Sequence, residues 1–271
     1  MNLKEYFAEN NRFVFISEVR SGEKPWSVIK SIRSIITGAL ANIPGTGTAA
    51  FEGFAEIRDI ADGSGKKRET TLSVTRSLYL ASDLHLKAFG IFIGAGTFLE
   101  AGAIIKSPCY IGSGCEIRQG AYLRGDVIIG SHSVVGHVTE VKNSIFMDHT
   151  HAGHFAYVGD SILGSHVNLG AGTKLANLQF RTKEELDSDT ISEIIIRTGD
   201  GAAATGMNKL GAVIGDYTEI GCNTVTAPGA IIGSGCWIYP NTTLPKGIYD
   251  GNKVIRNKGA GGGVEILRKP V

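Results

Sequence analysis

Residues 93–123 read IGAGTFLEAGAIIKSPCYIGSGCEIRQGAYL, and an aliphatic residue opens each group of six in this stretch. The spacing continues without a miss to residue 141 and resumes at residue 214, with one threonine among the later positions. The positions that share it are Ile93, Leu99, Ile105, Ile111, Ile117, Leu123, Ile129, Val135, Val141, Ile214, Ile220, Thr226, Ile232, Ile238 and Leu244. A period of six is neither the period of a helix nor that of simple strand alternation. A repeat of fixed length is also a better guide to the fold than the preferences of single residues for helix or strand.

A period of six suits a chain that makes a short strand, turns a corner and repeats, so that three hexapeptides close one triangular coil of about 18 residues. The aliphatic side chains then point into a prism, and successive coils stack like parallel strands about 4.8 Å apart. Glycine and other small residues permit the tight corners. The pattern is typical of the left-handed parallel β-helix of hexapeptide-repeat proteins. The left hand is inferred from that resemblance, because parallel crossovers are otherwise right-handed.

The chain divides by pattern into a repetitive body and two different ends. Residues 91–250 form the predicted β-helix, with an inserted loop or hairpin at residues 178–207. Residues 1–90 form an N-terminal cap or subdomain, and residues 251–271 form a C-terminal tail. The Gly-rich start of its last stretch, GAGGGVEILRKPV, suggests flexibility. A helix is predicted near residues 25–40 from the spacing of four apolar residues. These are Trp26, Ile29, Ile32 and Ile36.

Composition narrows the class of protein. The formal net charge of +1, with no concentrated run of Lys and Arg, argues against nucleic-acid binding. No apolar segment approaches the roughly 20 residues that a membrane span needs, and no signal-peptide pattern is seen, so a cytoplasmic protein without membrane contact is expected. The four cysteines form no CxxC pair, which argues against a disulfide framework or a zinc cluster.

Three cations recur at the interval of one coil. Lys106, Arg124 and Lys142 each follow an inward aliphatic residue and are separated by three hexapeptides, so they should form a column on one edge of the prism. Like charges about 4.8 Å apart repel, so an anionic group is expected nearby. Either Glu140 or Asp126 neutralises the column, or the column holds a phosphate. Both possibilities stay open at the level of the sequence.

The regular period breaks just after Lys142. The next inward residues are expected to be Phe146, Ala152, Val158 and Leu163. His154 then lies one coil from Lys142, so stacking is expected to gather Arg124, Lys142 and His154 around a single pocket. A histidine, with its ordinary pKa of about 6.5, is suited to act there as a general base.

The motifs in this region resemble those of a known enzyme family. The segments AYLRGDV, GHVTEVKNS, HAGHFAYVGDSILG and VNLGAGTKLAN are similar to the acetyltransferase domain of the bifunctional glucosamine-1-phosphate acetyltransferase/N-acetylglucosamine-1-phosphate uridylyltransferase family. The resemblance covers residues 93–245 and leaves the first ninety residues outside. It implies a homotrimeric enzyme of nucleotide-sugar biosynthesis that transfers an acetyl group from acetyl-CoA, as co-substrate, to the amine of a phosphorylated amino sugar without a metal.

The resemblance also implies roles for individual residues. His154 corresponds to the catalytic base, and Lys209 corresponds to a phosphate ligand that is reached only after the long insertion. The positions implied for sugar-phosphate binding are Arg124, Lys142, Tyr157, Asn168 and Asn177, and those implied for acetyl-CoA binding are Ala171 and Cys222. Leu178 stands where the family usually has an aromatic residue.

Two other functions remain open from the sequence. The altered loop after Asn177 would suit a non-catalytic sugar-phosphate or nucleotide-sugar binding module related to the sugar nucleotidyltransferases. The three histidines of the HTHAGH stretch at residues 149–154 raise the question of a metal site, and the RGD at residues 124–126 faintly resembles that of the gamma-class carbonic anhydrases, which bind zinc. Lys142 stands where a second histidine would be required, and histidines at a corner point in different directions, so no metal is expected.

Overall fold

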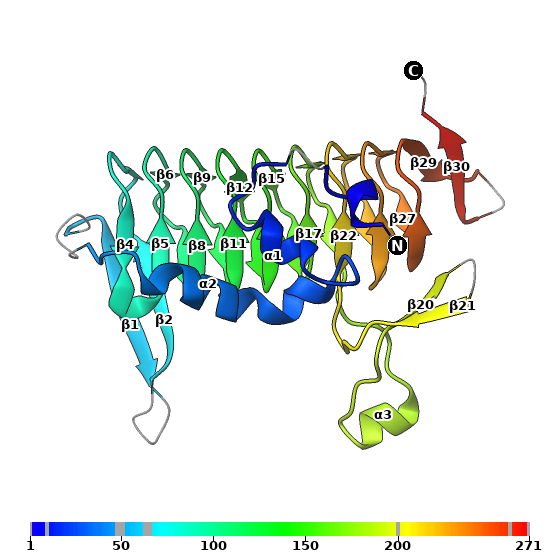
Figure 1. The fold of residues 1–271 in the computed structure, drawn as a ribbon, viewed down its shortest axis with the longest axis horizontal. Helices are drawn as coiled ribbons and strands as arrows, with labels where there is room; N and C mark the ends of the chain where they lie inside the picture. The colour runs from blue at the N-terminus through cyan, green and yellow to red at the C-terminus, as the bar shows by residue number, and fades with distance from the viewer. Residues whose placement is uncertain are drawn as a thin grey trace.

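The computed structural model describes residues 2–8, 11–46, 52–61, 67–198, 201–259 and 262–269. The chain winds into a long three-walled prism in which each coil gives one strand to each wall (Figure 1). The three walls are parallel sheets along the coils, here called sheets A, B and C. The expected fold class, a left-handed parallel β-helix of hexapeptide repeats with a small helical N-terminal cap, is confirmed.

The strands are short, as the hexapeptide period requires. In order across sheet A they are β1 (Ala55–Ala61), β2 (Lys67–Val74), β7 (Ile104–Lys106), β10 (Tyr122–Leu123), β13 (Glu140–Lys142), β16 (Tyr157–Gly159), β19 (Lys174–Leu175), β24 (Val225–Thr226) and β27 (Thr243–Leu244). Across sheet B they are β3 (Leu78–Tyr79), β6 (Phe98–Leu99), β9 (Glu116–Ile117), β12 (Val134–His137), β15 (His151–His154), β18 (Asn168–Leu169), β23 (Glu219–Ile220), β26 (Trp237–Ile238), β29 (Lys253–Asn257) and β30 (Val264–Arg268). Across sheet C they are β4 (Leu84–Leu86), β5 (Ile91–Ile93), β8 (Cys109–Ile111), β11 (Val127–Ile129), β14 (Ser144–Phe146), β17 (Ile162–Leu163), β22 (Ala212–Ile214), β25 (Ala230–Ile232) and β28 (Gly247–Tyr249).

The register follows the predicted coil length and then shortens by a single residue. Leu123 pairs with Val141 across β10 and β13, a full coil of three hexapeptides, whereas Val127 pairs with Ser144 across β11 and β14, one residue less. The shortening coincides with the predicted break in the period. The four inward residues expected after the break are confirmed, because none has exposed surface: Phe146, Ala152, Val158 and Leu163.

The N-terminal segment covers sheet C. Its described helices are η1 (Leu3–Glu5), α1 (Ile16–Arg20), η2 (Ser27–Ser31) and α2 (Ile32–Ala41), and η4 (Lys87–Phe89) follows β4. Helix α2 runs along the front of the prism in Figure 1, and Ile32 and Ile36 pack in one apolar cluster with Ile128 and Ile145 of sheet C. Sheet C is thus an internal layer, and the predicted site residues on the strands of sheets A and B lie on the other two walls.

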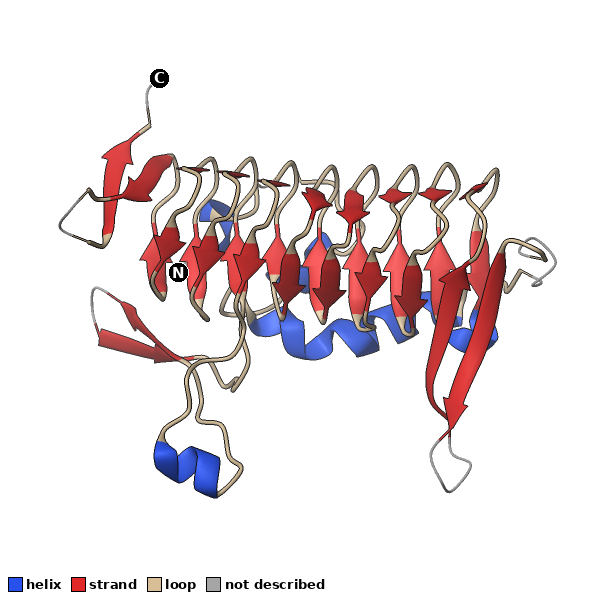
Figure 2. Ribbon diagram, turned by 180° about the vertical axis from the view of Figure 1, so that it is seen from behind, coloured by secondary structure: helices blue, strands red, loops and turns tan. Residues whose placement is uncertain are grey.

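The insertion leaves the prism after β19 and returns to it before β22. It contains α3 (Lys183–Asp187), which a Thr182/Glu185 capping box begins, and the antiparallel hairpin of β20 (Ile195–Thr198) and β21 (Gly201–Ala204). Figure 2 shows α3 projecting away from the walls. Ile194 and Ile196 are buried in the same cluster that covers sheet C, so the base of the insertion is packed against the prism.

Antiparallel strands border the prism at its ends. At the N-terminal end β2, β3 and β4 pair antiparallel with β7, β6 and β5, one in each sheet, and β1 extends β2 as a long hairpin. At the other end β29 continues sheet B beside β26, and β30 pairs antiparallel with β29. Among the described residues, no helix combines the length and the hydropathy needed to cross a membrane.

Candidate functional site

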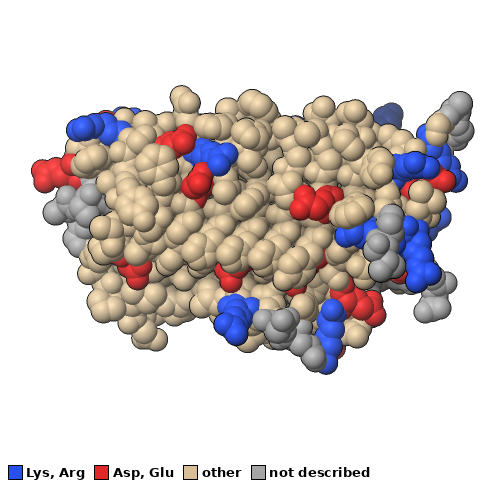
Figure 3. Space-filling model, turned by 90° about the horizontal axis from the view of Figure 1, so that it is seen from above, with Lys and Arg blue, Asp and Glu red and all other residues tan. Residues whose placement is uncertain are grey.

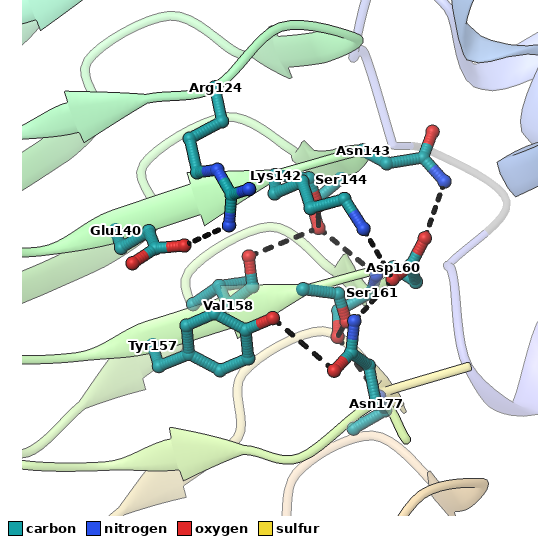
Figure 4. A network of polar contacts seen from close by, with 12 residues as sticks. Arg124, Glu140, Lys142, Asn143, Ser144, Tyr157, Val158, Asp160, Ser161 and Asn177 are labelled. Carbon is teal, nitrogen blue, oxygen red and sulfur yellow. Dashed lines mark hydrogen bonds and ion pairs between the residues drawn. The ribbon is translucent and has the colours of Figure 1, made fainter. Parts of the chain in front are cut away.

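The cation column lies on sheet A, and carboxylates meet two of its members (Figure 4). Arg124 Nη1 donates to Glu140 Oε1 at 2.6 Å, and Lys142 Nζ lies 3.6 Å from Asp160 Oδ2. Of the two carboxylates expected to neutralise the column, Glu140 therefore does so. Asp126 pairs instead with Arg33 of the N-terminal segment, at 2.9 Å.

Asp160, which lies in the HAGHFAYVGDSILG segment but received no role from the sequence, organises a buried polar network. Its side chain accepts from Asn143 Nδ2 at 2.7 Å and from Asn177 Nδ2, and it is only 5% exposed. Tyr157 Oη donates to Asn177 Oδ1 at 3.2 Å. Burial, and then the negative charges of Glu140 and Asp160, raise the pKa of Tyr157. The phenol is therefore a protonated donor at neutral pH.

Lys209 joins this region although the insertion separates it in sequence. The returning chain is fixed by Leu210 N, which donates to Asn177 O at 3.0 Å, and by Gly211 N, which donates to Asp160 O at 2.9 Å. Lys209 and Asp160 both line a cavity of about 490 Å³ at the corner between sheets A and C. The sheet A group, as it is called below, comprises Arg124, Lys142, Tyr157, Asn177 and Lys209.

The remaining predicted residues gather along sheet B. A cavity of about 550 Å³ crosses several coils of this wall, and four predicted residues line it. His154 is exposed at the end of β15, and its ring stacks on that of His137 with centroids 5.7 Å apart. Asn168 Nδ2 donates to Glu219 Oε2 at 3.0 Å. The sheet B group, as it is called below, comprises His154, Asn168, Ala171 and Cys222.

The expectation that Arg124, Lys142 and His154 line a single pocket of one chain is wrong. The cavity that contains His154 is lined by neither cation, because β15 belongs to sheet B and β13 to sheet A. The reason is the register. His154 follows Lys142 by two hexapeptides, which is two walls along the spiral and not one full coil. Phe155, with a φ of 53°, lies at the corner where the chain leaves sheet B for sheet A.

The histidines of HTHAGH divide between two places. His151 and His154 face the sheet B cavity, whereas His149 stacks between His132 and His166 with ring centroids 5.0 and 4.7 Å apart. Burial, and then the neighbouring imidazoles of His166 and His132, lower the pKa of His149. Within the part of the chain that the structure describes, no three His, Cys, Asp or Glu side chains are placed to hold a metal ion.

Two paired glycines form part of the sheet B wall beside His154. Gly136 of β12 lies so close to β15 that a Cβ on it would stand 1.7 Å from the carbonyl oxygen of Gly153. A Cβ on Gly153 itself would meet no atom within 4 Å, and this residue lines the cavity. Packing against β15 thus requires a glycine at residue 136. At residue 153 a side chain would have room, and the glycine leaves open space in the cavity.

One protein family and several known proteins match part of this chain. The family described as the GMPPB C-terminal domain matches residues 93–196. A bifunctional sugar-1-phosphate nucleotidylyltransferase/acetyltransferase of Sulfurisphaera tokodaii is 35% identical over 45% of this chain and 28% of its own length. A bifunctional protein GlmU of Methanocaldococcus jannaschii is 32% identical over 45% of this chain and 27% of its own length. The chain therefore spans less than a third of either relative.

Among solved structures, a mutant of AntD, an N-acyltransferase from Bacillus cereus in complex with dTDP and coenzyme A, aligns over 64% of this chain and 81% of its own. Its sequence identity is 11% and the TM-score is 0.35, which is too low to guide an assignment of residues. The sequence matches are more informative, because their identity is higher. The hexapeptide-repeat part of this chain is similar to the bifunctional sugar-1-phosphate nucleotidylyltransferase/acetyltransferases, and the resemblance seen in its motifs is confirmed.

Proposed function

We propose that this protein transfers an acetyl group from acetyl-CoA to the amine of a phosphorylated amino sugar. The observation that carries the proposal is that His154 lines a cavity of about 550 Å³ together with Ala171 and Cys222, the two residues expected to contact acetyl-CoA. The sheet A group supplies cations, a phenol and an amide of the kind that orient a sugar phosphate. The acetyltransferase named in the relative from Sulfurisphaera tokodaii supports the same reaction.

The proposed chemistry needs one base and accurate positioning. The amine nitrogen attacks the thioester carbonyl carbon, the C–S bond breaks, and the thiol of CoA is released. His154 accepts the proton that the nitrogen loses as the new C–N bond forms, and returns it to the departing sulfur. The sheet A group holds the phosphate and sugar, so that the amine meets the thioester in a fixed orientation.

We further propose that two copies of the chain complete one site, within a homotrimer. The two groups lie on different walls. A second copy that presents its sheet B opposite would bring a base to a sugar phosphate held on sheet A. A cyclic trimer brings unlike walls together in this way and closes on itself. Two apolar side chains at the corner between these walls support such packing: Val138 is 61% exposed and Phe155 is 55% exposed.

The distribution of charged side chains on the surface supports side-by-side packing of copies of the chain. Seen from above, the prism presents a broad face on which charged side chains are sparse (Figure 3). Depletion of charged residues at the centre of a contact is the usual mark of a protein interface. A face of this kind therefore suits contact with another copy.

The activity is tested by a thiol-release assay with acetyl-CoA and a panel of amino-sugar phosphates. We expect CoA release that depends on an acceptor carrying both an amine and a phosphate. Binding of the sugar phosphates without any CoA release would favour the non-catalytic binding module instead. A requirement for added zinc, with loss of activity on chelation, would contradict the metal-free mechanism.

The division of the site between copies predicts that inactive variants rescue each other. We expect His154→Ala and Lys142→Ala each to be nearly inactive alone. Co-expressed with different tags and purified as mixed trimers, they should regain activity. Every mixed trimer then contains one site that takes an intact His154 from one copy and an intact Lys142 from the next.

The matched control for this experiment pairs two variants of the same group. Arg124→Ala mixed with Lys142→Ala should regain nothing, since both residues then come from one copy and every sheet A group carries a defect. Equal rescue in both mixtures, or rescue in neither, would contradict a site shared between copies.

A further inference from the structure

The cavity at the corner between sheets A and C has a lining that the family resemblance does not account for. Its volume is about 490 Å³, and its wall includes Lys209 of the sheet A group and Asp160. Two further lining residues come from outside the repeat: Lys30 from η2 of the N-terminal segment and Glu193 from the insertion. Three separate parts of the chain therefore meet in one cavity.

The ammonium group of Lys30 reaches the loop that carries Lys209. Lys30 Nζ lies 2.7 Å from the position that a Cβ on Gly206 would take, so glycine leaves room for the ammonium there. Glu193 accepts from the backbone N–H of Gly206 and in this way fixes the same loop. The N-terminal segment and the end of the insertion thus meet at the cavity.

The two cations of this cavity differ in their surroundings from those on the sheet A wall. Arg124 and Lys142 already have carboxylates at 2.6 and 3.6 Å. Within the described ranges, neither Lys30 nor Lys209 has an ion pair or a side-chain hydrogen bond, and both line the cavity. Two ammonium groups without carboxylate partners around one cavity repel each other and favour an anion between them.

The carboxylates of the cavity do not cancel these two charges. The carboxylate of Asp160 lies beside Lys142, so its charge is matched on the sheet A side. Glu193 is left as the single carboxylate of the lining to set against the two ammonium groups of Lys30 and Lys209. With the charge of Asp160 matched by Lys142, the two ammonium groups and Glu193 leave one positive charge in excess.

We propose that Lys30 and Lys209 bind a phosphoryl group of the acceptor in this cavity, so that the N-terminal segment forms part of the substrate site. The proposal rests on the proposed function for the identity of the acceptor, and it adds a ligand from a segment that the family resemblance leaves outside. A lysine ammonium is a compact point charge that suits a phosphoryl oxygen. The phosphoryl group can belong to a sugar 1-phosphate or to the diphosphate of a nucleotide sugar.

The test is direct binding to the intact chain by calorimetry, with glucose 1-phosphate, UDP-glucose and inorganic phosphate as probes. We expect Lys30→Met to weaken the binding of at least one probe about tenfold, the loss typical of one charge-assisted contact. A loss confined to glucose 1-phosphate identifies a monoester, and a loss confined to UDP-glucose identifies a diphosphate. The matched control is Lys183→Met, on the exposed helix α3 of the insertion, which should bind every probe as the unmodified chain does.

The outcome separates this inference from the proposed function. Unchanged affinity of Lys30→Met for all three probes, or no binding of any probe by the unmodified chain, would overturn the phosphoryl site. Loss of binding in Lys30→Met together with no CoA release from any acceptor would support the phosphoryl site and reject the acetyl transfer. Because Lys30 is exposed and methionine keeps much of the length of the side chain, unfolding is not expected, and the thermal midpoint of the variant checks this.

Discussion

Replacing His154 by alanine should lower the kcat of acetyl transfer by about 10²- to 10⁴-fold, which corresponds to roughly 3–5 kcal/mol of barrier. His154 ends β15 beside the corner that leads to sheet A, where its imidazole can take a proton from an attacking amine, and alanine has no group that replaces it. Affinity for CoA should change little, since Ala171 and Cys222 stay in place. Thiol release at saturating substrates measures kcat, and calorimetry with CoA measures the affinity for CoA.

The matched control is His151→Ala. His151 lies on the same strand, β15, and lines the same cavity, but at the end of the strand away from the corner that leads to sheet A. We expect its kcat to stay within a few fold of that of the unmodified chain. A large loss in His151→Ala combined with a mild effect in His154→Ala would move the role of base to His151.

Replacing Gly136 by alanine should lower the free energy of unfolding by about 3 kcal/mol, which is near the upper end for forcing an extra methyl group into packed structure. The new Cβ would stand 1.7 Å from the carbonyl oxygen of Gly153, and two paired strands would have to move apart. For a chain of this size the thermal midpoint should fall by about 6–12 °C. Denaturant unfolding measures the free energy of unfolding, and thermal unfolding measures the midpoint.

The paired glycine on the next strand serves as the control. Gly153→Ala places its Cβ in open space, so we expect a change within about 0.5 kcal/mol. Equal destabilisation by both substitutions would mean that close contact between β12 and β15 is not the reason why residue 136 must be glycine. The pair compares the same chemical change on neighbouring strands of one wall.

The interior of the prism could be predicted well because each inward position is decided by burial alone. An aliphatic residue at every sixth place leaves one arrangement that hides all of them, and the same logic carried through the break to Phe146 and Leu163, both fully buried. The column of cations follows from the same register, since Leu123 pairs with both Ile105 and Val141, the residues that precede Lys106 and Lys142.

The outer walls were harder to predict. Residues that are close in sequence can lie on different walls and face different directions. The expectation that His154 lies beside Lys142 is wrong for this reason, because His154 lies on sheet B and Lys142 on sheet A. The contacts of Asp160 escaped prediction because they depend on a shortened coil and on a chain returning from the insertion. Lys30 belongs to a segment without a repeat, so no register connects it to Lys209.

The antiparallel strands at the N-terminal end of the prism limit how copies can associate. On each of the three walls, the first coil is covered there by a strand that runs against it, so the open edge of that coil is not offered to another molecule. A second prism approaching this end head to tail would meet antiparallel strands in place of a parallel coil, which works against growth into a continuous fibre. A prism that ends in this way favours its flanks as the surfaces through which further copies join.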